Sequence, residues 1–82
     1  MQLSVEISKY PLAEDYKGPI LAFIGQLAQE AEIEVLTNTM STQIFGEYDA
    51  VMQALQRCMR WSMERYGKLV FVCKFIPGDL RP

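Results

Sequence analysis

Three side chains near the N-terminus have the types and spacing of a ligand-binding surface. Glu6, Ser8 and Tyr10 alternate along the chain, so in an extended strand they lie on one face. A carboxylate, a hydroxyl and an aromatic ring on one face suit a flat heterocycle. Two plainer interpretations stay open: Tyr10 packs only at the strand end, where Pro11 stops pairing, and Glu6 is a solvated carboxylate or pairs with a base across an interface.

A second group of polar side chains clusters further along the chain. Hydroxyl groups occur at Thr37, Thr39, Ser41 and Thr42, and Met40 stands among them. Hydroxyls orient neutral polar ligands in pockets whose walls are mostly apolar. Serine and threonine are also ordinary residues of turns and strands, so a purely structural role stays open.

Several kinds of catalysis are excluded by composition. The chain has no histidine, and its two cysteines, Cys58 and Cys73, lack the CxxC spacing of a zinc site. Glu6, Asp49 and Asp79 are acidic, but no paired arrangement for acid–base chemistry is visible in the sequence. We therefore expect a protein that is not an enzyme and that uses neither a metal nor a cofactor.

Periodicity predicts the elements that position these side chains. Alternation predicts strands over 2–8, 32–38, 39–45 and 69–76, and spacings of three and four predict helices over about 16–31 and 47–66. The order β-α-β-β-α-β is typical of the ferredoxin-like α+β fold, with a four-stranded antiparallel sheet and two helices on one face. Residues 1–82 are expected to form a single domain.

The last predicted strand indicates assembly. Residues 69–76 are apolar on both faces, interrupted only by Lys74, and the helices can cover one face alone. Domains of about this size bury little surface and gain from oligomerisation. We expect a homodimer or homotetramer that covers the open face of the sheet.

Charge and hydropathy exclude two kinds of partner. Eight basic and ten acidic residues give a net charge of −2, which does not attract nucleic acid or an anionic membrane surface. No apolar run approaches the roughly 20 residues that span a bilayer, and the N-terminus does not read as a signal peptide. The expected location is the cytoplasm.

Three short motifs in order resemble the YkoF-like family of thiamine- and hydroxymethylpyrimidine-binding proteins. They are Ser8-x-Tyr10-Pro11-Leu12, Ser41-Thr42-x-x-x-Gly46-x-x-Asp49-x-Val51 and Pro77-Gly78-Asp79. The resemblance covers nearly the whole chain. It implies a non-enzymatic, single-unit carrier or sensor of a thiamine-like heterocycle that oligomerises through its sheet.

The resemblance also implies a pocket between the sheet and the hairpin. Four residues match the family's pattern: Ser8, Tyr10, Ser41 and Thr42. Glu6, Thr37 and Met40 are added here from their chemistry, with Glu6 balancing a thiazolium charge. The alternative function is an oligomerising structural or regulatory module that binds no ligand.

Overall fold

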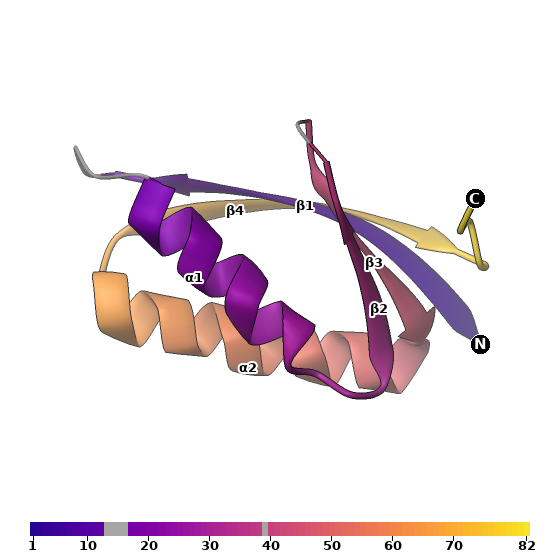
Figure 1. The fold of residues 1–82 in the computed structure, drawn as a ribbon. Coiled ribbons are helices and arrows are strands. Elements are labelled where there is room, and N and C mark those ends of the chain that lie inside the picture. Colours follow the sequence, from indigo (N-terminus) through magenta and orange to yellow (C-terminus); the bar gives the residue numbers. More distant parts are fainter. Residues whose placement is uncertain (13–16, 39) are drawn as a thin grey trace.

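The predicted fold is confirmed in a computed structural model of the chain, which describes residues 1–12, 17–38 and 40–82. The elements are β1 (Gln2–Pro11), α1 (Lys17–Ala28), β2 (Ile33–Thr37), β3 (Thr42–Glu47), α2 (Tyr48–Tyr66) and β4 (Leu69–Pro77). The strands form one antiparallel sheet in the order β2-β3-β1-β4, and both helices lie on one of its faces (Figure 1). Tyr16 and Thr39 lie outside the described residues.

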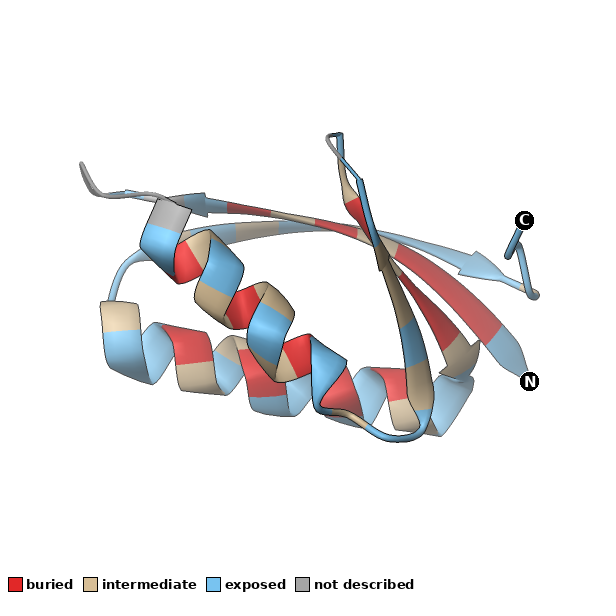
Figure 2. Cartoon of the chain, in the orientation of Figure 1, coloured by how far each residue is buried: buried red, intermediate tan, exposed pale blue. Residues whose placement is uncertain are grey.

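The core lies between the sheet and the two helices (Figure 2). Strand β1 contributes Leu3, Val5 and Ile7, each less than 5% exposed. These residues alternate with Ser4, Glu6 and Ser8, as the sequence pattern predicts, and meet Leu27 of α1 and Leu55 of α2 in the core. Successive residues of a strand point to opposite faces, so β1 divides the molecule into a helix side and an open side.

Helix α1 ends sooner than predicted. Its last turn is tight, because the amides of Gln29 and Glu30 donate to the carbonyls of Gln26 and Leu27, three residues back. Ala31, the last residue of the predicted helix, therefore lies in the turn that leads to β2. Pro19 lies in the first turn of α1, where its missing N–H costs nothing.

Helix α2 is bounded by two local features. The Glu47 carboxylate accepts hydrogen bonds from the amides of Asp49, at 2.8 Å, and Ala50, at 3.4 Å. At the other end Gly67 adopts a φ of 78°, which favours glycine. The buried side of α2 includes the small residues Ala54, Cys58 and Ser62 besides Val51 and Leu55, and Met59 packs against it half-buried.

The open face of the sheet is covered in part, whereas the sequence predicted a bare face. After β4 the chain folds back across β1, where the Ser4 hydroxyl donates to the Gly78 carbonyl and accepts from the Leu80 amide. Arg81 then pairs with Glu34 of β2 at 2.7 Å. Ser4 and its neighbour across the sheet, Phe45, are consequently buried.

The rest of the open face is exposed and apolar. Val70, Val72 and Ile76 of β4 lie on it, each between 42% and 48% exposed.

Within the part of the chain that the structure describes, no helix is long and apolar enough to cross a membrane.

Candidate functional site

A pocket forms where β1 extends beyond its neighbour β3. The pairing of β1 with β3 ends at Ile7 opposite Thr42, whereas its pairing with β4 continues to Pro11 opposite Leu69. Among the described residues, no strand therefore pairs with residues 8–10 on the β3 side. The space between this overhang, α1 and the β2–β3 hairpin is a pocket of about 260 Å³.

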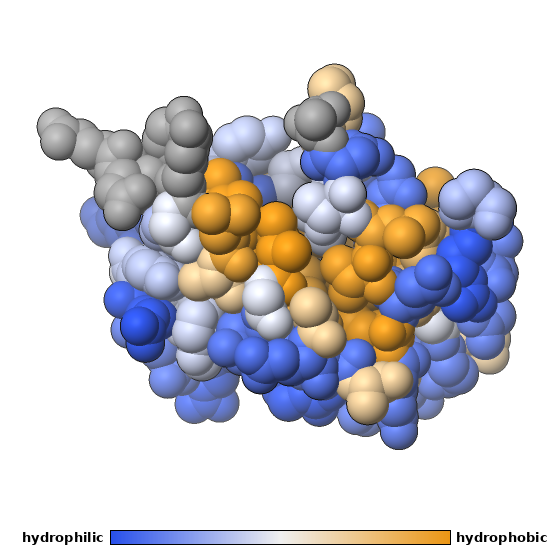
Figure 3. Space-filling view, viewed as in Figure 1, coloured by the Kyte–Doolittle hydropathy of each residue, from blue (hydrophilic) through white to orange (hydrophobic). Residues whose placement is uncertain are grey.

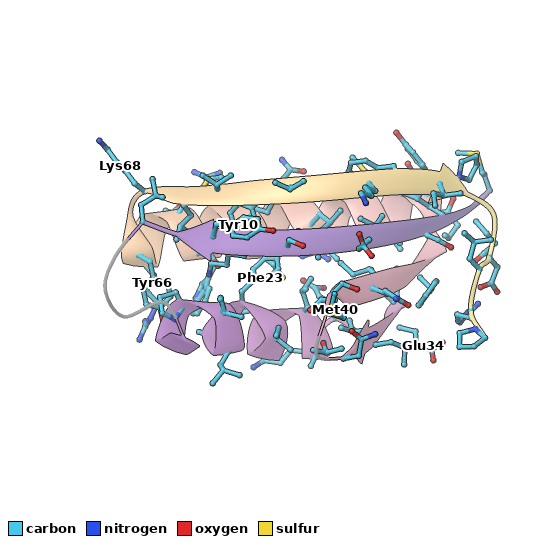
Figure 4. The ribbon with its side chains drawn as sticks, turned by 90° about the horizontal axis from the view of Figure 1, so that it is seen from above. Tyr10, Phe23, Glu34, Met40, Tyr66 and Lys68 are labelled. Carbon is cyan, nitrogen blue, oxygen red and sulfur yellow. The ribbon has the colours of Figure 1, made fainter. Side chains whose placement is uncertain are left out.

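Six of the seven residues predicted from sequence line this pocket. They are Ser8, Tyr10, Thr37, Met40, Ser41 and Thr42. Tyr10 and Met40 lie at its rim, 55% and 88% exposed, and Thr42 is buried deeper, at 7%. In Figure 4, Tyr10, Phe23 and Met40 are seen to come from three different elements around the pocket.

A compact turn holds the hydroxyl groups of the hairpin in place. The Asn38 side-chain oxygen accepts from the amides of Met40 and Ser41, at 2.8 and 2.9 Å. The backbone N–H of Asn38 donates to the backbone carbonyl of Ser41, which closes the turn. The strand β3 therefore begins at Thr42 and not at Thr39, and the hydroxyls of Thr37 and Thr42 lie 3.3 Å apart.

Apolar side chains form the other walls. Ile20, Phe23 and Ile24 of α1 line the pocket opposite the hairpin. On the face viewed in Figure 3, apolar residues gather over α1 and the β2–β3 hairpin. Apolar walls with a few fixed hydroxyl and amide groups are the usual composition of a site for a small polar ligand.

Glu6 is the one predicted site residue that the structure places elsewhere. The pocket opens on the helix side of the sheet, and Glu6 lies on the open side, where it lines a separate cavity of about 230 Å³. Its carboxylate is 3.5 Å from the Lys74 ammonium. The sequence placed Glu6 on one face with Ser8 and Tyr10. Ser8 and Tyr10 reach the pocket because β1 does not pair with β3 at these two residues, whereas Glu6 still pairs with Gln43 of β3.

Lys9 is a pocket residue that the sequence analysis did not select. It is 7% exposed, and its ammonium donates to the Pro19 carbonyl at 2.6 Å and to the Ser62 hydroxyl at 3.2 Å. Lys9 continues the alternation of Leu3, Val5 and Ile7, so the signal that it points into the helix side was present in the sequence.

Aromatic rings surround the Lys9 ammonium. Its nitrogen lies 5.2 Å from the ring centroids of Phe23 and Tyr66 and 5.8 Å from that of Phe71. The electron-rich faces of such rings attract a cation, which stabilises the charge in this setting. Burial acts in the opposite direction and lowers the pKa of the Lys9 amine below its ordinary value.

No metal site is apparent among the described residues. Within residues 1–12, 17–38 and 40–82, no three cysteine, aspartate or glutamate side chains are grouped so that they could hold an ion. The pocket offers hydroxyls, an amide and one ammonium, which bind polar ligands by hydrogen bonds.

Solved structures share this fold at low sequence identity. A protein from Thermotoga maritima, provisionally described as a thiamine biosynthesis or salvage protein, superposes with a TM-score of 0.81 at 17% identity, over 99% of this chain and 85% of its own. A hypothetical protein from Methanocaldococcus jannaschii gives 0.80 at 18% identity, over 99% and 84%. A DUF77 domain of unknown function from Bacillus cereus gives 0.78 at 16% identity, over 98% and 79%.

No family model and no curated protein matches the sequence. The structural likenesses therefore establish a shared fold over nearly the whole chain.

Proposed function

We propose that this protein is a non-enzymatic, cytoplasmic binding protein for a small heterocycle of the thiamine type, thiamine or its hydroxymethylpyrimidine moiety. The observation that carries the proposal is that Ser8, Tyr10, Thr37, Met40, Ser41 and Thr42 all line the same pocket. Further support comes from the motif resemblance to YkoF-like proteins and from the similar fold of the Thermotoga protein.

The size and chemistry of the pocket suit such a ligand. A volume of about 260 Å³ lies just below the usual range for small-molecule sites and suits a ligand of one or two small rings. The rings of Tyr10 and Phe23 offer surfaces for stacking, and the Thr37–Thr42 pair offers hydroxyls to the ring nitrogens and the amino group of a pyrimidine.

Titration calorimetry with hydroxymethylpyrimidine and with thiamine tests the proposal. We expect saturable binding of at least one of them, weakened roughly tenfold in Thr42→Val, because the change removes one hydroxyl and keeps the side-chain shape. The matched control is Gln43→Ala, the next residue on the same strand, which faces the open side and should leave the affinity unchanged. Absence of heat with both ligands at millimolar concentration would contradict the proposal.

A second candidate function rests on the exposed apolar surface of β4. Val70, Val72 and Ile76 suit contact with another subunit, as a structural or regulatory module requires. Ser41→Ala together with Thr42→Ala separates the two functions. Lost ligand binding with intact oligomers supports the pocket, and assembly of a wild-type protein that binds no ligand supports the module.

A further inference from the structure

We propose that Lys9 makes this pocket select uncharged heterocycles against cationic ones, so that the hydroxymethylpyrimidine type of ligand is preferred over one carrying a thiazolium. The inference rests on the proposed function and specifies its ligand class. Three observations about the Lys9 ammonium support it. Lys9 is the only charged residue among the described residues that line the pocket, two hydrogen bonds fix its ammonium, and that ammonium contacts three aromatic rings.

Lys9 supplies the only charged side chain among the described residues that line the pocket. The carboxylate assigned from sequence to balance a cationic ligand, Glu6, faces the other side of the sheet and pairs there with Lys74. A positive ligand would therefore lie close to a positive charge and to no negative charge of the described lining residues. In a buried setting this repulsion is screened far less than in water.

The charge is held close behind the pocket wall. The Lys9 nitrogen lies 5.2 Å from the centroid of the Phe23 ring, and that ring itself lines the pocket. Hydrogen bonds to the Pro19 carbonyl and to the fully buried Ser62 hydroxyl fix the ammonium between the two helices. A side chain anchored at both acceptors cannot swing into solvent to relieve the repulsion without losing both bonds.

Three aromatic rings that could attract a cationic ligand, those of Phe23, Tyr66 and Phe71, already contact the Lys9 ammonium. Phe23, Tyr66 and Phe71 surround the Lys9 ammonium at 5.2 to 5.8 Å, the arrangement with which proteins bind quaternary nitrogens of ligands. Here the Lys9 ammonium takes the place among the rings that the cationic group of a ligand would otherwise occupy. The pocket beside it keeps its hydroxyls, which bind uncharged donors and acceptors.

A matched pair of ligands isolates the charge. Deazathiamine has the shape of thiamine, but a carbon replaces the quaternary ring nitrogen, so it is uncharged. We expect the wild-type protein to bind deazathiamine about tenfold or more tightly than thiamine, the effect of one unit charge held behind the wall of a partly buried site. In Lys9→Met, which keeps an unbranched apolar side chain, we expect this ratio to fall to about one.

The control variant keeps the charge and removes one of its partners. Ser62→Ala deletes the hydroxyl acceptor but not the ammonium, so it should retain the preference for deazathiamine. Circular dichroism establishes that each variant is folded. Thiamine binding as tightly as deazathiamine to the wild-type protein, or an unchanged ratio in folded Lys9→Met, would overturn the inference while leaving the proposed function intact. Binding of neither compound, nor of hydroxymethylpyrimidine, would overturn the proposed function and the inference with it.

Discussion

Lys9 occupies a position at which the alternation of β1 predicts a core residue. Leu3, Val5 and Ile7 precede it at every second place and are buried, and Lys9 follows them into the same side of the sheet. Its methylene groups fill core volume, and its ammonium reaches two oxygen acceptors and three rings. A buried charge costs folding free energy, so it is retained here at the expense of stability.

This cost predicts a pH dependence that a variant can isolate. Burial lowers the pKa of the Lys9 amine below 10.5, so between the folded-state pKa and 10.5 the unfolded chain binds more protons than the folded one. In that window stability rises with pH, because the amine becomes neutral in the folded state first. We expect Lys9→Met to be more stable than the wild type at neutral pH and to lose this advantage as the pH approaches 10.5.

Urea unfolding of both proteins at neutral pH and near pH 10.5 measures the effect. Titration of Cys58 has the opposite effect on stability and is present in both proteins. Burial raises the pKa of the Cys58 thiol to about 11, so stability falls as the pH rises from 9 toward that value. Only the difference between the two proteins therefore reports on Lys9. A difference that stays constant or grows with pH would show that the Lys9 amine is not desolvated.

At the scale of elements, local chemistry decides where helices and turns end. Asn38 closes the hairpin with its side chain, Glu47 caps α2, and Gly67 ends it with a positive φ. Each of these residues acts within four positions of its own place in the chain. Their effects are consequently accessible to single substitutions that leave the core intact.

Two glycines should respond to the same substitution with opposite signs. Gly25 lies in the interior of α1 with nothing within 4 Å of an added Cβ, so Gly25→Ala should stabilise the protein by about 0.5–1 kcal/mol. Gly67 has equal space, but its φ of 78° is strained for alanine, so Gly67→Ala should destabilise it by about 1–2 kcal/mol. Thermal or urea unfolding measures both variants.

The comparison separates space from backbone conformation. Because an added methyl group meets no atom at either position, only the backbone requirement differs between them. Destabilisation by Gly25→Ala, or a neutral Gly67→Ala, would show that helix propensity and the positive φ are not what these glycines provide.

At the scale of the whole molecule, the open face of the sheet is divided between two covers. The segment after β4 covers the part around Ser4 and Phe45, and nothing in the described chain covers Val70, Val72 and Ile76. Exposed valine and isoleucine side chains on an edge strand favour association. The expected oligomer therefore needs to bury only the β4 half of this face.

A charge placed on that half should prevent assembly. We expect the wild-type protein to form a dimer or tetramer at micromolar concentration and Val72→Glu to be a folded monomer, because a carboxylate cannot be buried there without a partner. Gln53→Glu places the same charge on the exposed side of α2 and should leave the assembly unchanged. Light scattering gives the masses. A monomeric wild-type protein, or a Val72→Glu variant with unaltered mass, would exclude this face as the interface.

The sequence by itself determined the order of elements, the alternation in β1 and the hydroxyls of the hairpin, because these depend on spacing between near neighbours. It also carried the burial of Lys9, although a lysine is seldom assigned to a core. The end of α1 was harder to predict from the sequence, because backbone hydrogen bonds in its last turn set it. The buried side of α2 was also harder to predict, because hydropathy does not mark a residue such as Ser62 as part of the core.

Only the tertiary structure decided which residues share a pocket. Glu6 and Ser8 are two positions apart on one strand, yet one lines the open-side cavity and the other the pocket beneath the hairpin. The reason is the register: β3 begins at Thr42, opposite Ile7, and β1 continues past that point without it. Where one strand outlasts its neighbour is a property of pairing between distant segments, and no periodicity within either segment encodes it.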